Sequence, residues 1–117
     1  MPSIRDLVDA IRQRDGVDAA VVLGRDGLLI DGQLIPGLDA DVIAARIPAI
    51  IAAADEFGTA TSRGELVTAV LEYGRGMAVI SALTLDAVLL VLVAPHANVG
   101  QLLLELRRNR EHIAALV

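Results

Sequence analysis

The sequence contains no cysteine, no lysine and no tryptophan, and its only aromatic residues are Phe57 and Tyr73. The absence of cysteine excludes disulfides, thiolate metal sites and cysteine nucleophiles. Apolar residues nevertheless make up 55% of the 117 residues, so alanine, valine, leucine and isoleucine must build the core. This apolar fraction argues against intrinsic disorder, and the length fits a single domain over residues 1–117.

Long apolar runs and clustered positive charges are also missing. The longest apolar run, residues 87–95, is about half as long as a membrane-spanning helix, and the first residues lack the basic and apolar regions of a signal peptide. The net charge is −5, whereas binding to nucleic acid requires clustered cations. We therefore expect a cytoplasmic protein that neither binds nucleic acid nor inserts into a membrane.

Hydrophobic periodicity and turn residues divide the chain into eight elements in the order α-β-β-α-β-β-β-α. Apolar residues at helical spacing predict three helices, over residues 4–14, from a cap at Asp39 or Asp41 to Phe57, and from Asn98 to the last residues. Runs rich in β-branched residues predict strands over 17–23, 28–30, 65–73, 77–83 and 87–94. The last of these strands is apolar at every position, which predicts a central strand covered on both faces.

The middle helix is apolar on nearly all sides, which is typical of a helix that is buried on both sides. One side carries Ile43, Ile47, Ile50, Ala54 and Phe57. The opposite side carries a row of small residues, namely Val42, Ala45, Ala49, Ala52 and Ala53. Pro48 cannot donate a hydrogen bond to the carbonyl of Ala44, so we expect a kink or a boundary at residues 46–48.

No group of residues indicates catalysis, a cofactor or a metal. There is no P-loop sequence, and the glycines on either side of Arg75 are explained by a hairpin turn. His96 and His112 lack the spacing of a zinc site and the partners of a catalytic triad. Asn98 is explained as a helix cap. Basic residues close to the end of the last helix, Arg107, Arg108 and Arg110, are explained by the helix dipole.

Two segments, in order around the alanine-rich middle helix, carry a resemblance to a known family. The first is the hairpin over residues 21–28, with the sequence VVLGRDGL. The second, over residues 90–100, is an apolar strand followed by a proline and by Asn-x-Gly at the start of a helix, with Glu105 in its second turn. Together they resemble the Roadblock (dynein light-chain) family, specifically its short bacterial and archaeal MglB-like members, over almost the whole chain.

The resemblance implies an α/β fold of the profilin-like, α+β sandwich type. Its single five-stranded antiparallel sheet has the middle helix on one face and the first and last helices on the other. The resemblance also implies a dimer in which the middle helices pack together and the third strands join edge to edge. Because residues 65–73 contain no proline, lysine or bulge residue, a partner strand would also protect this edge. The predicted homodimer interface consists of Val42, Ala45, Ala49, Ala52, Ala53, Val67, Ala69 and Leu71.

Members of this family bind small GTPases, dynein subunits or membrane-anchored scaffolds, and the resemblance implies no enzymatic activity and no cofactor. We therefore expect a dimer that regulates a Ras-like small GTPase through its paired middle helices. The charged residues that flank the alanine side of the helix are the predicted partner-binding residues, namely Asp41, Arg46, Asp55 and Glu56. The alternative is a structural light chain or scaffold subunit, which assembles with other Roadblock-type chains without acting on a GTPase.

Overall fold

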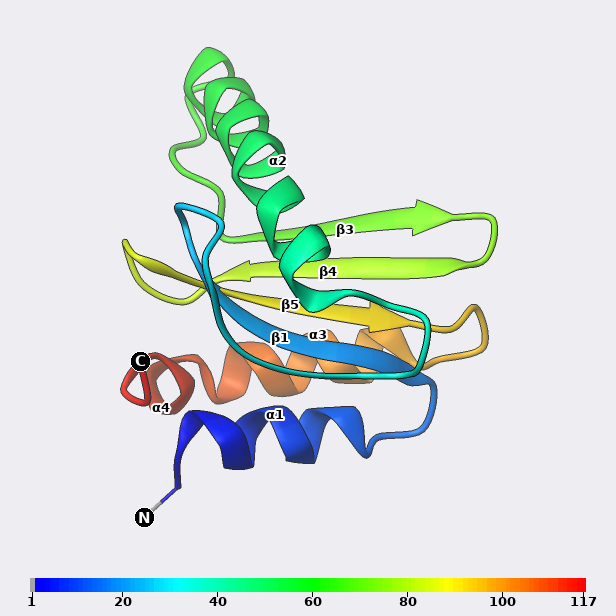
Figure 1. The fold of residues 1–117 in the computed structure, drawn as a ribbon. Coiled ribbons are helices and arrows are strands. Elements are labelled where there is room, and N and C mark those ends of the chain that lie inside the picture. The colour runs from blue at the N-terminus through cyan, green and yellow to red at the C-terminus, as the bar shows by residue number, and fades with distance from the viewer. Residues whose placement is uncertain (1) are drawn as a thin grey trace.

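One antiparallel sheet of five strands forms the middle layer of the computed structural model, which describes residues 2–117 (Figure 1). The strands lie in the order β2-β1-β5-β4-β3, so β5 is central and β2 and β3 are the two edges. This order confirms the predicted central strand and the predicted edge strand. The strand bounds are Val17–Gly24 for β1, Leu29–Leu34 for β2, Thr68–Tyr73 for β3, Gly76–Ala82 for β4 and Ala87–Val93 for β5.

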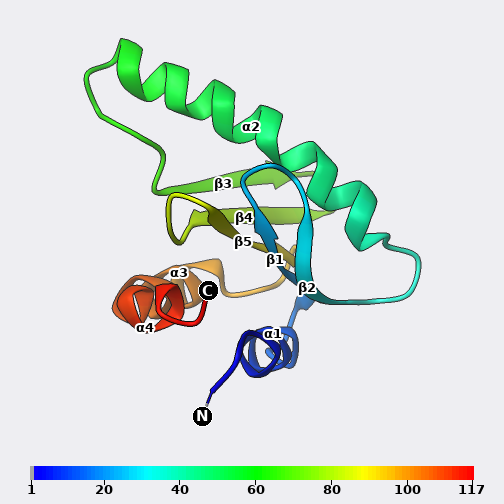
Figure 2. The same ribbon diagram turned by 60° about the vertical axis from the view of Figure 1, so that its left-hand side comes forward.

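Helices cover both faces of the sheet. Figure 2 shows α2 alone on one face, and α1, α3 and α4 on the other. The helices comprise Ile4–Arg12 in α1, Ala40–Ala60 in α2, Val99–Arg108 in α3 and Arg110–Ala114 in α4. This arrangement confirms the predicted fold class.

Side-chain caps fix where three of the helices begin. Ser3 and Asp6 form a reciprocal capping box at the start of α1. Asp39 accepts hydrogen bonds from the first backbone N–H groups of α2, and Asn98 accepts one at the start of α3. These contacts satisfy N–H groups that lack a partner within the helix.

The core consists of two apolar layers separated by the sheet. On the α2 face, Ala44, Ile47 and Ile51 of the helix pack over strand residues that include Ile80 and Leu90. On the other face, helices α1, α3 and α4 cover a cluster built on Ala20, Val22, Leu89 and Val91. Strand β5 therefore contributes alternate residues to both layers, as expected for an apolar strand covered on both faces.

Helix α2 differs from its predicted form. It is unbroken at Pro48, so no helix boundary occurs at residues 46–48, and it continues past Gly58 to Ala60. The tip of the β1–β2 hairpin packs against this part of the helix. A Cβ atom placed on Gly27 would lie 3.1 Å from Cγ of Pro48 and 3.4 Å from the carbonyl oxygen of Ala44. The hairpin therefore covers the turn at which the proline removes a backbone donor.

The predicted last helix is two helices in the structure. Both the backbone N–H and the side-chain amide of Asn109 donate to the carbonyl oxygen of Glu105, at 3.0 and 2.8 Å. This side-chain bond competes with continued helix formation, and α4 then begins at Arg110. The guanidinium of Arg110 donates to the carbonyl of Ala82, so this arginine anchors α4 to the end of β4.

Three further boundaries differ from the prediction by more than one residue. Strand β3 begins at Thr68 instead of residue 65, helix α1 ends at Arg12 instead of residue 14, and β2 extends to Leu34 instead of residue 30. The late start of β3 has a local cause, because the backbone N–H of Leu66 bonds to a side chain of α2 instead of a neighbouring strand.

Candidate partner-binding surface

The edge of β3 is open for pairing with another strand. Tyr73 and Gly76 face each other across the two-residue β3–β4 turn. This pairing determines which residues of β3 direct their backbone groups toward β4 and which direct them outward. By this alternation the backbone groups of Thr68, Val70 and Glu72 point away from β4. Among residues 2–117, no side chain bonds to these outward N–H groups.

The opposite edge of the sheet, at β2, has one outward donor occupied by a side chain. The backbone N–H of Gly32 in β2 donates to Oδ1 of Asp31 at 2.8 Å. Asp31 also pairs with Arg5 of α1 at 3.0 Å. A side chain that occupies an outward backbone donor makes the edge less available for another strand. One outward donor of β2 is therefore occupied by a side chain, whereas within residues 2–117 none of the three outward donors of β3 is.

The small-residue side of α2 faces away from the sheet, as predicted. All five predicted helix residues are exposed, namely Val42, Ala45, Ala49, Ala52 and Ala53. Of the three predicted residues at β3, Val67 is exposed, whereas Ala69 and Leu71 are half-buried and pack beside the α2 core. The participation of these eight residues in an interface stays a prediction.

Phe57 departs from the predicted pattern of burial. It was expected on the buried side of α2, yet 70% of its surface is exposed. The buried line of the helix runs through Ala44, Ile47 and Ile51, and the last turns of α2 project beyond the β3 edge of the sheet (Figures 1 and 2). Phe57 therefore has no sheet beneath it. Tyr73 is also exposed, to 63%.

The four predicted partner-binding residues have different surroundings. Asp41, Arg46 and Glu56 are exposed on α2. Asp55 is half-buried and makes contacts within the chain, because its carboxylate accepts a hydrogen bond from the N–H of Leu66 at 2.7 Å and lies 3.6 Å from the guanidinium of Arg25. A part in partner binding remains a prediction for all four residues, and Asp55 has a structural role in addition.

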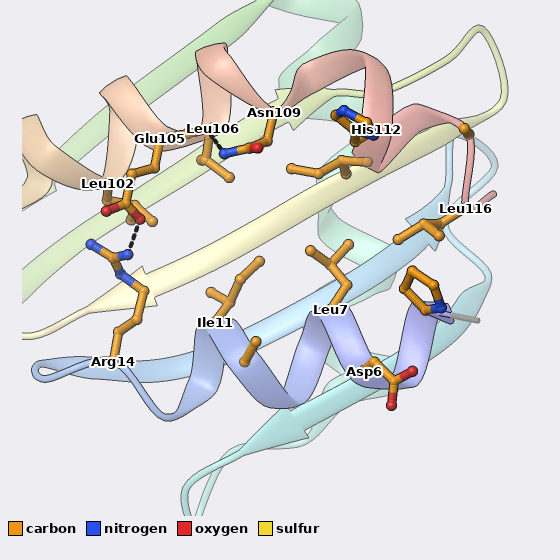
Figure 3. A pocket seen from close by; sticks show the side chains of 14 residues that line it. Asp6, Leu7, Ile11, Arg14, Leu102, Glu105, Leu106, Asn109, His112 and Leu116 are labelled. Atoms are coloured by element: carbon orange, nitrogen blue, oxygen red, sulfur yellow. Dashed lines mark hydrogen bonds and ion pairs between the residues drawn. The ribbon is translucent and has the colours of Figure 1, made fainter.

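A groove that the sequence did not indicate lies on the other face of the molecule, between α1 and the pair α3 and α4 (Figure 3). Its volume is about 640 Å³. Apolar side chains line it, including Leu7, Ile11 and Leu116, and an ion pair between Arg14 and Glu105 joins its two walls. Periodicity predicts which side of each helix is apolar, but the groove depends on the spacing between the helices.

The histidines are not part of a reactive cluster. His96 lies 4.0 Å from the exposed carboxylate of Asp15, and His112 lines the groove. Over residues 2–117, no three side chains of the types that bind metals come together. No helix in the same range has the length and apolar character needed to cross a bilayer. Of the C-terminal arginines, Arg107 and Arg108 are exposed.

Comparison with known proteins gives a consistent family. A family model described as the Roadblock/LC7 domain matches residues 4–94. The uncharacterized protein MJ1340 of Methanocaldococcus jannaschii is 28% identical over 109 residues, which cover 91% of this chain and 92% of that protein.

Three solved structures share the fold. The Roadblock/LC7 domain from Streptomyces avermitilis matches with a TM-score of 0.84 and 21% identity, over 96% of this chain and 95% of that one. The gliding protein MglB from Thermus thermophilus matches with a TM-score of 0.83 and 16% identity, over 96% and 86%. A structure described as MglB with tetrameric arrangement matches with a TM-score of 0.84 and 16% identity, over 96% and 85%.

Proposed function

Because the chain belongs to the Roadblock/LC7 domain family, we propose that it is a non-catalytic, cytoplasmic homodimer that regulates a Ras-like small GTPase. One observation carries the proposal. The open edge of β3 and the exposed small-residue side of α2 lie on neighbouring elements, so a single symmetric contact would cover the edge and bring two α2 helices together.

The dimer that we propose joins the two β3 strands in an antiparallel pair. Val70 is the middle one of the three residues whose backbone groups point outward, so the twofold axis is placed at Val70. The result is a continuous sheet of two five-stranded halves with both α2 helices on the same face. The tetrameric arrangement described for one MglB structure supports assembly as a property of this fold.

The paired α2 helices would form the surface that binds the GTPase. Small side chains let two helix backbones approach closely, and the exposed charges of Asp41, Arg46 and Glu56 would occur twice around them. Small GTPases differ between nucleotide states mainly in their switch loops, so a regulator that distinguishes the states must contact those loops. Because the sequence places no arginine as a finger that would enter the nucleotide site, we propose that the dimer acts by repositioning residues of the GTPase.

Replacing Arg46 and Glu56 together with alanine should abolish capture of the GTPase in a pull-down while the dimer stays intact by light scattering. The matched control replaces Arg107 and Arg108, which are exposed on the other side of the sheet, and should leave capture unchanged. Asp55 is left native because its contacts support the fold.

Loss of capture only in the variant that lacks Arg107 and Arg108 would move the partner site to the opposite face and overturn the assignment. A dimer that captures no small GTPase would favour the scaffold-subunit role instead.

A further inference from the structure

Both aromatic side chains of this protein are exposed. The chain has one phenylalanine and one tyrosine, and Phe57 and Tyr73 are exposed to 70% and 63%. Large aromatic side chains are normally highly buried, and where they are exposed they often mark contact surfaces. Five of the eleven large apolar side chains that are exposed in the structure lie in α2, in β3 or immediately before β3, namely Val42, Phe57, Val67, Val70 and Tyr73.

Phe57 and Tyr73 lie at opposite ends of β3 within one chain. The hydrogen bond from the N–H of Leu66 to Asp55 holds the last turns of α2, and therefore Phe57, beside the segment that leads into β3. Tyr73 is the last residue of β3. At about 3.4 Å per residue, the strand separates the two ends by roughly 20 Å, so the two aromatic residues cannot contact each other within a protomer.

Both residues are nevertheless on the same face of the sheet. Ala69 and Leu71 pack beside the α2 core, and side chains alternate along a strand, so Tyr73 also belongs to the α2 face. The last turns of α2 project on this face beyond the edge of β3 (Figures 1 and 2). A chain that continued the sheet across this edge would therefore lie beneath them.

We propose that Phe57 of each protomer packs against Tyr73 of the partner subunit. The inference rests on the dimer proposed above. In an antiparallel pair centred on Val70, the residue opposite Val67 is the partner's Tyr73, because both are three positions from the axis. The last turns of α2, which carry Phe57, are held beside Leu66 by its bond to Asp55, so in this dimer Phe57 comes close to the partner's Tyr73, and the symmetry produces this contact twice.

The occupant of this surface is a second copy of the same chain for two reasons. First, the surface is continuous with the open β3 edge. Second, each protomer offers both a phenylalanine and a tyrosine, so Phe57 of one protomer can pair with the partner's Tyr73 at two equivalent places. An aromatic pair contributes about 0.5–1.5 kcal/mol beyond its buried area, which corresponds to a roughly 2- to 10-fold change in the dissociation constant for each contact.

Cross-linking tests the contact directly, because the chain has no native cysteine. The double variant Phe57→Cys with Tyr73→Cys, treated with a short bismaleimide, should yield covalent dimer on a denaturing gel, whereas either single variant should yield little. Val70→Cys is the matched control, since it should cross-link to itself across the axis. Cross-linking by Val70→Cys without any by the double variant would overturn the aromatic contact and leave the β3 dimer standing. Failure of both, with a light-scattering mass near 12.3 kDa, would overturn the dimer and the contact together.

A mixing experiment tests the same contact without cysteine. The homodimer of Phe57→Ala lacks the phenylalanine of both aromatic pairs. The homodimer of Tyr73→Ala lacks the tyrosine of both pairs. A heterodimer of the two variants retains one complete pair, so mixing should enrich it several-fold over the statistical 1:2:1 distribution in native mass spectrometry. A distribution that stays statistical contradicts the proposal. Both side chains are exposed, so circular dichroism should show unchanged folds.

Discussion

The carboxylate of Asp55 joins α2 to two other segments of the chain. It accepts the N–H of Leu66 before β3 and lies beside the guanidinium of Arg25 at the tip of the first hairpin. The Nε atom of Arg25 is buried, and the structure over residues 2–117 gives it no hydrogen-bond partner. Loss of Asp55 would therefore leave the half-buried N–H of Leu66 without its acceptor and Arg25 without its ion-pair partner.

Asp55→Ala should lower the free energy of unfolding by about 1–3 kcal/mol, the usual cost of leaving buried polar groups unpaired. Urea denaturation of the purified protein measures this change. Glu56→Ala is the control, because Glu56 is the exposed neighbour on the same helix, and it should change stability by less than about 0.5 kcal/mol. Equal effects of the two substitutions would show that Asp55 has no structural role.

The sequence could not separate Asp55 from Asp41. Both are carboxylates on the middle helix, and both lie beside its alanine side when the helix is considered alone. Their difference arises from tertiary contacts, since the loop after α2 returns under the helix at Asp55, whereas Asp41 stays exposed. The exposure of Phe57 was missed for the same reason. Helical spacing predicts the direction of its side chain, but it does not predict the point at which α2 extends beyond the sheet.

At the scale of the elements, the contact between the first hairpin and α2 fixes how the helix lies on the sheet. Gly27 has φ = 89° and sits against Pro48 and the carbonyl of Ala44. A side chain at this position meets both a left-handed backbone and a crowded neighbour. Gly37 has a similar φ of 96° but no atom within 4 Å of a Cβ placed on it. Comparing substitutions at the two glycines therefore distinguishes the cost of backbone strain from the cost of crowding.

Gly37→Ala should lower the free energy of unfolding by about 1–2 kcal/mol, the cost of a left-handed non-glycine residue. Gly27→Ala should cost about 1–3 kcal/mol more, because its methyl group crowds Pro48 and α2 must shift. Chemical denaturation of both variants checks the difference. If Gly27→Ala costs no more than Gly37→Ala, the hairpin does not constrain the helix.

Elements that a single strong sequence pattern determines were predictable. Elements whose bounds depend on competing side-chain or tertiary contacts were not. The apolar run over residues 87–94 correctly predicted the central strand, and helical spacing correctly predicted the exposed alanine side of α2. The break at Asn109 was missed because helical spacing continues through it, while a side-chain bond to Glu105 ends α3. Of the kink or boundary expected at residues 46–48, the boundary is absent, because α2 runs through Pro48. The contact between Gly27 and Pro48 depends on the tertiary fold, so the sequence did not indicate it.

The whole molecule has two different faces. One carries α2 and adjoins the open β3 edge, and the other carries the groove between α1 and the pair α3 and α4 (Figures 2 and 3). The fold was predictable at this scale because the order of elements and two short segments agree with one family. The groove was not predictable, because no single segment of the sequence contains it.

Calorimetric titration of the protein with the Ras-like small GTPases encoded in the same genome shows directly whether it regulates one of them. Each GTPase is loaded either with GDP or with a non-hydrolysable GTP analogue. We predict that one of them binds with clearly different affinity in its two nucleotide states, because in the proposed dimer the paired α2 helices contact its switch loops. Binding of equal strength in both states, or no binding by any of these GTPases, would contradict it.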